Sequence, residues 1–230
     1  MKLAITQPTY FPWLGYFYLI FKSDKFIFLN DIKTEGKGTN KGWQRRNKIK
    51  CSYNLETYIT IPTTNESKNK LINQVEIVEK KYFEKHLEKI QQEYKKTLYF
   101  DEIFSFLKSI YKKEIYNLSE LNIYIIKTIC EKNSIDMDYE ISSNIKTTST
   151  KTDRLIEICK IYKSKHYIST PGSKVYLDES LFKKNDIKLE YIDYPTFIYK
   201  QNSKKFLEKL SVIDFLFNNG FHLKEYFKNI

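Results

Sequence analysis

The chain has 230 residues, of which 41% are hydrophobic and 16% aromatic, enough for a folded core and too much for an intrinsically disordered protein. The formal net charge of +11, from 39 Lys and Arg against 28 Asp and Glu, favours anionic partners such as nucleotides, nucleic acid or an anionic membrane face. Cys51, Cys130 and Cys159 are an odd number without CxxC spacing, which indicates neither a disulfide framework nor a zinc site and predicts reduced thiols in a cytoplasmic protein.

The N-terminal residues predict a strand and contain no signal peptide. The most apolar segment, residues 16–21, is too short to cross a bilayer. We therefore expect a soluble protein without membrane insertion.

The first thirty or so residues predict the smallest unit of a parallel sheet, a strand, a helix and a second strand. Residues 2–6 and 25–29 are short apolar runs, and apolar residues from Trp13 to residue 21 recur at helical spacing. Ligands of such sheets bind beyond the carboxyl ends of the strands. Gln7 and Asp31 each follow a strand, so we expect both on the same rim.

The segment 33–50 is strongly basic, with seven basic residues and one acidic residue. Residues 33–42 predict a mobile loop whose glycines match no dinucleotide or P-loop fingerprint, so phosphate binding would come from side chains. Residues 58–61 predict a strand, and residues 65–70 a loop.

Residues 79–134 predict three helices, the last of which begins at a capping box opened by Asn117. We interpret them as a helical insertion or a lid within a single domain of residues 1–230. His86 lies on an apolar helix face, which indicates a packed structural histidine.

Strands and helices alternate in the rest of the chain. Strands are predicted at residues 137–141, 166–169 and 187–192, and helices at 152–162, 181–185 and 211–219, the last ending at Gly220. The prediction is an α/β fold with a mostly parallel sheet flanked by helices.

Three arginines are the first binding candidates, because the chain otherwise uses lysine for positive charge. Arg45, Arg46 and Arg154 would offer the planar fork that binds carboxylate or phosphate. Arg45 or Arg46 alone is equally explained by a weak surface ion pair. Arg154 opposes the dipole at a helix start and therefore invites a specific partner.

Hydroxyl groups follow the strand at 166–169. Ser169, Ser173 and the nearby Tyr176 suit phosphate or sugar binding, and the same cluster is also typical of an ordinary turn. Both interpretations stay open.

Several motifs spread over nearly the whole chain form one pattern. They are residues 4–12 (AITQPTYFP), 15–17, 19–20, Asp24, Phe26, Asp31, 42–49 (GWQRRNKI), 152–156 (TDRLI), 167–173, Tyr176 and 210–220. Together these motifs resemble the WbqC-like family of bacterial proteins. The resemblance implies a role in clusters for O-antigen, lipopolysaccharide and other surface polysaccharides, where transfer of glycyl or another acyl group onto an amino sugar is the suggested activity.

The leading hypothesis is therefore an N-acyl or aminoacyl transferase acting on a nucleotide-linked amino sugar. Arg46 and Arg154 would hold the diphosphate and Trp43 would stack on the base or sugar, while Tyr10 and Trp13 join the substrate-binding candidates. Gln7 and Asn47 would orient polar groups. Asp31 would be the general base, or else a carboxylate that only positions Arg45 or Arg46.

The acyl donor is left open, and no bound cofactor or metal is expected. An aminoacyl-tRNA would be held by Lys33, Lys37, Lys41 and Lys50. Acyl-CoA or an acyl carrier protein would also meet a basic surface.

Two other classes remain. Most glycosyltransferases that hold the diphosphate of a nucleotide sugar by a metal use a short Asp-x-Asp pattern, and the one match near a strand is Asp136-Met137-Asp138, which precedes its strand. A nucleic-acid or scaffold protein without activity would be favoured if no pocket lay between Gln7, Asp31 and Asn47. Cys51 lacks a nearby histidine in sequence and is interpreted as structural.

Overall fold

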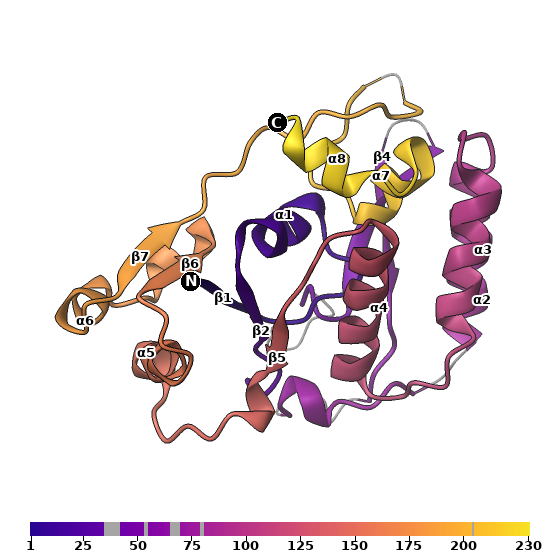
Figure 1. Cartoon of the computed structure of the whole chain (residues 1–230). Helices are drawn as coiled ribbons and strands as arrows, with labels where there is room; N and C mark the ends of the chain where they lie inside the picture. Colours follow the sequence, from indigo (N-terminus) through magenta and orange to yellow (C-terminus); the bar gives the residue numbers. More distant parts are fainter. Residues whose placement is uncertain (35–41, 53–54, 65–69, 79–80, 204) are drawn as a thin grey trace.

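The structure is a computed structural model that describes residues 1–34, 42–52, 55–64, 70–78, 81–203 and 205–230 (Figure 1). The glycine-containing loop expected at 33–42 and the loop expected at 65–70 lie almost wholly outside the described residues, as do Lys37 and Lys41.

Within the described residues, five strands form one parallel sheet, as expected for the α/β class. The strands are β1 (Lys2–Thr6), β2 (Lys25–Phe28), β5 (Tyr139–Ile141), β6 (His166–Ser169) and β7 (Lys188–Tyr191). Their spatial order is β5-β2-β1-β6-β7, and every neighbouring pair is parallel. The chain thus moves outward on one side of β1 and then returns to build the other side.

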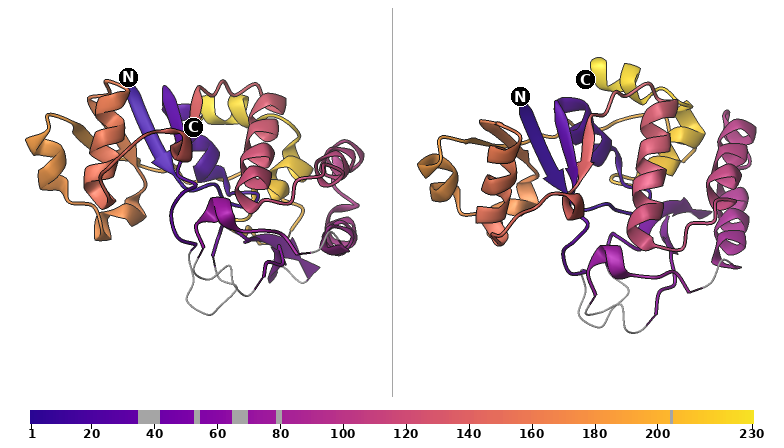
Figure 2. Two further views of the ribbon diagram at one scale, coloured as in Figure 1. Left: turned by 90° about the horizontal axis from the view of Figure 1, so that it is seen from below. Right: turned by 60° about the horizontal axis from the view of Figure 1, so that its bottom comes forward.

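Alternating side chains of the strands pack into two cores, one on each face of the sheet. Ala4, Phe26 and Phe28 join the larger core, which includes helix α1 (Leu14–Lys22). Leu3 and Ile27 join the smaller core on the opposite face, under α5 (Lys151–Ile161) and α6 (Glu179–Lys184). Figure 2 shows α1 and the pair α5 and α6 on opposite sides of the sheet.

The long segment between β2 and its sheet neighbour β5 carries most of the remaining structure. It holds the strands β3 (Arg46–Cys51) and β4 (Leu55–Thr60) and the helices α2 (Lys81–Tyr94), α3 (Phe100–Tyr111) and α4 (Leu118–Lys132). Residues of all three helices belong to the larger core. The helices therefore pack as an insertion in the sheet order.

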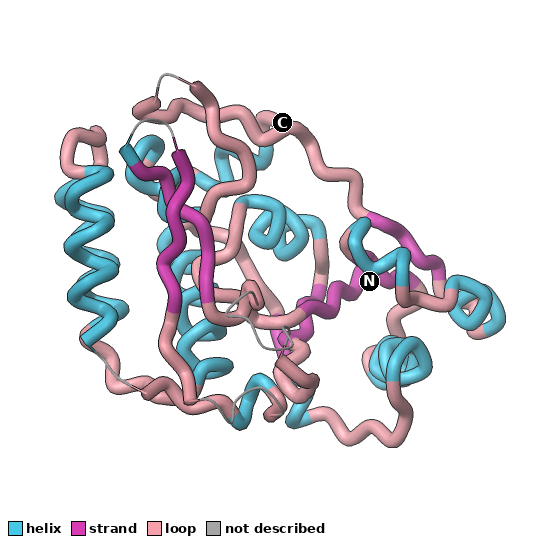
Figure 3. The backbone as a smooth tube through the Cα atoms, turned by 180° about the vertical axis from the view of Figure 1, so that it is seen from behind, coloured by secondary structure: helices cyan, strands magenta, loops and turns pink. Residues whose placement is uncertain are grey.

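The antiparallel pair β3 and β4 lies beside the helices α2 and α3 (Figure 3). His86 on α2 is buried, as predicted, and accepts a hydrogen bond from the Thr60 amide of β4. Asn117 caps α4 by accepting from the amides of Ser119 and Glu120.

Sequence analysis missed β3 and α8 (Leu223–Lys228) and placed several boundaries one to a few residues off. Strand β3 alternates buried Asn47 and Ile49 with Arg46, Lys48 and Lys50. Its period of two was hidden because one of its two buried positions is the polar Asn47. The chain closes with α7 (Val212–Asn219), whose end at Gly220 was predicted.

Candidate functional site

The best candidate for a ligand site is a cavity of about 330 Å³ at the carboxyl edge of the sheet. Thr6 ends β1 and Thr170 directly follows β6, and both line the cavity. Between β1 and β6 the winding of the sheet reverses, and ligands of doubly wound sheets bind in the crevice at such a point. The topology and the cavity thus identify the same place.

The cavity wall combines aromatic rings, hydroxyl groups and two cations. Such a wall can stack a planar ring, hydrogen-bond a sugar and hold an anion. The full lining is Thr6, Thr9, Pro12, Trp13, Tyr16, Leu19, Trp43, Asn47, Lys48, Thr170, Tyr194 and Lys209.

Asn47 shapes this wall through its side-chain amide. Its Nδ2 donates to the carbonyl of Tyr10 at 3.1 Å and to that of Phe11 at 2.8 Å, and the Ser211 hydroxyl also donates to the Phe11 carbonyl. Phe11 has a φ of 40°, which is unfavourable for a residue with a side chain. These bonds hold the loop in that conformation, so the Asn47 amide already has structural partners.

Trp13 is placed by the glycine two residues later. A Cβ atom on Gly15 would lie 2.2 Å from Cζ2 of Trp13. The indole therefore lies directly over Gly15 and forms part of the cavity wall.

Gln7 belongs to an amide network and does not line the cavity. The Gln44 side-chain amide donates to Oε1 of Gln7. Asn122 of α4 donates to the carbonyls of Pro8 and Gln44 at 3.2 and 2.7 Å. The network joins the N-terminal motif to the segment around Gln44.

Tyr10 is fully buried beneath the site. Its hydroxyl lies 3.1 Å from Nδ1 of His86 and 2.8 Å from the hydroxyl of Tyr111. Because Nε2 of His86 accepts the Thr60 amide, Nδ1 must carry the proton of the neutral ring and donate to Tyr10. Burial lowers the pKa of His86 to about 4, which keeps the ring neutral at pH 7.

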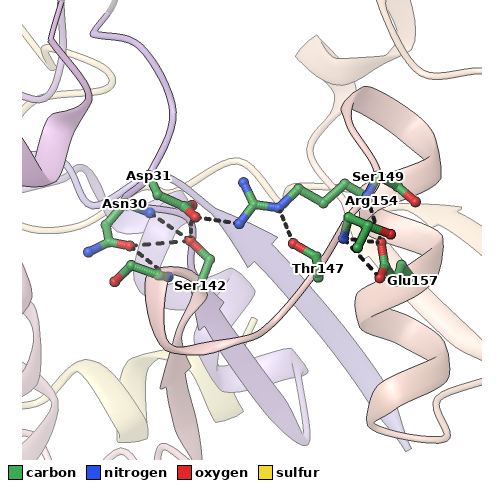
Figure 4. Close-up of polar contacts among 9 residues, drawn as sticks. Asn30, Asp31, Ser142, Thr147, Ser149, Arg154 and Glu157 are labelled. Atoms are coloured by element: carbon green, nitrogen blue, oxygen red, sulfur yellow. Dashed lines mark hydrogen bonds and ion pairs between the residues drawn. The ribbon is translucent and has the colours of Figure 1, made fainter.

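Asp31 lies on the same edge of the sheet but beyond β2, on the side away from β6. It forms an ion pair with Arg154 and accepts from the Ser142 hydroxyl, and Nε of Arg154 donates to Thr147 at 3.0 Å (Figure 4). Burial raises the pKa of Asp31, but the bonds from Arg154 and Ser142 outweigh it, so the pKa falls below its ordinary value. The partner that Arg154 was expected to need is thus this carboxylate.

The other two arginines also have partners within the protein. The guanidinium of Arg46 lies 4.2 Å above the ring centre of Tyr58 on the neighbouring strand. Nη2 of Arg45 faces the Ile61 carbonyl at 3.5 Å. The expected pairing of Asp31 with Arg45 or Arg46 is not found, and neither arginine lines the cavity.

Ser169 and Ser173 are buried, and their hydroxyl oxygens lie 2.7 Å apart. Ser173 donates to the Thr170 carbonyl, so Ser169 donates to Ser173. These bonds match the turn interpretation. Tyr176 is 69% exposed and, like the two serines, does not line the cavity.

The structure therefore brings Trp13, Trp43 and Asn47 together at one cavity and places the other predicted residues elsewhere. Gln7, Asp31 and Arg46 have separate partners and do not converge on it, while the roles assigned to them remain predictions. Thr6 and Thr170 could have been found from their places at strand ends. Lys209 and Tyr194 come from a segment that carried no signal in the sequence.

Across the described ranges, no group of three or more His, Cys, Asp or Glu side chains could hold a metal ion. Among the described helices, none has both the length and the apolar character that crossing a membrane requires.

Comparison with known proteins adds one family and one relative. The model of the WbqC-like protein family matches residues 7–226. The protein named uncharacterized protein Rv1507c, of Mycobacterium tuberculosis (strain ATCC 25618 / H37Rv), is 32% identical over 230 residues, which span 99% of this chain and 97% of the relative. No solved structure gives a significant match.

Proposed function

The chain belongs to the WbqC-like protein family, and on that premise we propose that it is a transferase of bacterial surface-polysaccharide biosynthesis. It moves an acyl or aminoacyl group, such as glycyl, onto the amino group of a nucleotide-linked amino sugar. The observation that carries this proposal is the cavity between the carboxyl ends of β1 and β6.

Each chemical part of a nucleotide-linked sugar has a complementary group in the wall. Trp43 is 42% exposed and offers a ring face for the base or sugar. Lys48 and Lys209 are the cations on the wall, and they suit the diphosphate, which would compete with the ion pair that Lys48 forms with Glu56. Thr6, Thr9 and Thr170 offer hydroxyl groups to the sugar.

The reaction joins an amine to an activated acyl group. The neutral amine attacks the carbonyl carbon, a C–N bond forms, and the bond from that carbon to the sulfur or oxygen of the donor breaks. One amine proton is released, and the leaving group takes up a proton. Asp31 would have to serve as base from outside the cavity with a lowered pKa, so we assign proton removal to solvent and assign to Asp31 the positioning of the rim.

We place the reaction in the cytoplasm, where nucleotide sugars and activated acyl donors are available. The described cysteines support this placement, since all three thiols are free and two are buried.

A metal-dependent glycosyltransferase is a weaker reading of the same cavity. Asp138 pairs with Lys25 at 2.7 Å and Asp136 with Lys224 at 3.1 Å. Both acids precede β5 and therefore lie at the amino edge of the sheet, opposite the cavity. The cavity is lined by Asn47 and not by Gln7 or Asp31, which is the arrangement expected of a scaffold without activity. The cavity itself supports an enzyme instead, because a scaffold would not need it.

The test is incubation with a panel of nucleoside-diphosphate amino sugars and activated acyl or aminoacyl donors, read by mass spectrometry. We expect the intact sugar nucleotide to gain the mass of the acyl group, and Trp43→Ala to slow the gain about tenfold through lost stacking. The matched control is Tyr116→Ala, which removes another exposed aromatic ring that does not line the cavity. Release of free nucleoside diphosphate, without a mass gain on the sugar, would identify a glycosyltransferase instead.

A further inference from the structure

A second cavity of about 300 Å³ adjoins the first. The two cavities share Trp13, Tyr194 and Lys209 as wall residues. Two ligands bound side by side would meet at these three residues. A transferase needs this arrangement, because its two substrates must be in contact when the group moves.

The wall of the second cavity is aromatic. Trp13 contacts the rings of Tyr194 and Phe197 edge to face, with centroids 5.1 and 5.7 Å apart. Tyr199 also lines the cavity, and its hydroxyl donates to the buried carboxylate of Asp214 at 2.9 Å. These contacts fix the positions of the rings.

Two residues of opposite charge complete this wall. Glu208 lines only the second cavity, whereas Lys209 lines both cavities. Aromatic rings with one carboxylate attract an organic cation, through ring quadrupoles and through the opposite charge. The lysine beside them suits an oxygen that carries partial or full negative charge.

We propose that the second cavity binds the aminoacyl group of the donor, with its primary ammonium held by Glu208 and the aromatic rings. The inference rests on the proposed function and adds the position and class of the second substrate. Glu208 is exposed to solvent, and a plain acyl group has no charge for its carboxylate to attract, so the wall favours a donor that carries an amine.

The shared position of Lys209 orders the reacting atoms. With the ammonium at Glu208, the donor carbonyl lies toward Lys209 and the first cavity. The sugar amine attacks that carbonyl carbon, negative charge develops on the carbonyl oxygen, and the Lys209 ammonium stabilises it. The oxyanion then re-forms the C=O double bond, the sulfur or oxygen of the donor leaves with the electron pair of the broken bond and takes up a proton, and the new amide nitrogen releases its proton to water.

The two tryptophans of the chain make each single-tryptophan variant a reporter of the cavities that its remaining ring borders. Trp43→Phe leaves Trp13, which borders both cavities, and Trp13→Phe leaves Trp43, which borders the first. The probes are glycinamide, which is a cation at neutral pH, and acetamide, which differs by lacking the amine. Fluorescence of the Trp43→Phe protein is followed during titration with each probe.

We expect glycinamide to change Trp13 fluorescence with saturation and acetamide to have no saturable effect. Adding Glu208→Gln should weaken glycinamide binding about tenfold, because the charged partner of the ammonium is lost. Glu102→Gln is the matched control, since Glu102 is an exposed glutamate of α3 that lines neither cavity.

Other outcomes overturn the inference. Equal binding of acetamide and glycinamide, or unchanged glycinamide binding by Glu208→Gln, would show that no ammonium is recognised. Titration of the Trp13→Phe protein with a nucleoside-diphosphate amino sugar tests the first cavity separately. Sugar nucleotide binding without glycinamide binding would remove the second site alone, and the reverse result would remove the proposed acceptor.

Discussion

Gly15 is the residue whose missing side chain most directly shapes the site. The Trp13 indole occupies the space that a Cβ would take, and Trp13 borders both cavities. A single methyl group at position 15 must therefore move the ring or the backbone of α1.

Gly15→Ala should lower the free energy of unfolding by about 1–3 kcal/mol, the usual cost of overpacking. It should also weaken ligand binding in both cavities. Chemical denaturation and Trp13 fluorescence measure the two effects. Gly172→Ala is the matched control, because a Cβ there has no atom within 4 Å; equal behaviour of the two variants would contradict the assigned place of Trp13.

Lys209 has a positive φ that no helix end accounts for, unlike three other residues of the chain. Ser134, Lys163 and Asp186 have positive φ one residue after a helix cap, a common position for it. Lys209 has a φ of 55° in a loop that borders both cavities. Strain kept at such a place is typical of functional sites.

Lys209→Gly and Lys209→Ala separate stability from function. Both remove the ammonium and should slow acyl transfer by a similar factor. The glycine variant should be more stable than the alanine variant by about 1 kcal/mol, since only alanine keeps the steric cost of positive φ. Thermal unfolding and turnover are the measurements, and full activity in the glycine variant would exclude a role for the ammonium.

At the scale of elements, the pair of Asp31 and Arg154 joins the end of β2 to the first turn of α5. The other two arginines are used within the protein as well. The rarity of arginine in the chain predicted that these positions need the planar guanidinium group. The guanidinium groups contact a carboxylate, a tyrosine ring and a carbonyl of the protein instead of facing a ligand in the cavity. Lysines border the cavity instead.

The Asp31 pair predicts a specific pH dependence. The pKa of the Asp31 carboxyl group is lower in the folded than in the unfolded protein. The stability that the pair contributes is therefore fully present above the unfolded pKa and is lost as pH falls through the folded pKa. Asp31→Asn should therefore flatten the acid limb of stability against pH, measured by denaturation from neutral pH downward. Asp186→Asn, at an exposed pair with Lys165, is the comparison, and an equal effect in both would contradict a special role for the Asp31 pair.

Sequence patterns were sufficient for elements with apolar periodicity, such as β1, α1 and the helices of 79–134. They were insufficient for β3, where the polar Asn47 occupies one of the two buried positions. The cavity depends on strand order, which places Thr170 beside Thr6 although 164 positions separate them in the chain. No local sequence pattern shows that residues so far apart in the chain meet at one cavity. Lys209 could not be predicted at the cavity for the same reason.

At the scale of the whole molecule, the reversal of winding between β1 and β6 creates the site, and the N-terminal motif builds its wall. Asn47, Gly15 and Gln44 act mainly by shaping the loop at residues 7–16. The two cavities beside this loop suggest an acceptor and a donor that meet at Lys209.

The net charge of +11 leads to a prediction about the donor. If the donor is an aminoacyl-tRNA, held in part by Lys33 and Lys50, its affinity should fall steeply with salt as counterions are released. Filter binding across salt concentrations measures the slope. Undetectable or salt-insensitive binding would leave an aminoacyl thioester of coenzyme A or of a carrier protein as the donor.

The central claim is that the acceptor binds where the sheet reverses its winding, and a crystal structure of the complex with a nucleoside-diphosphate amino sugar tests it most directly. The account predicts density for the ligand between Thr6 and Thr170, with a ring against Trp43 and the diphosphate near Lys48 and Lys209. Density for the diphosphate on Arg46 or at the Asp31 and Arg154 pair, with this cavity empty, would contradict it.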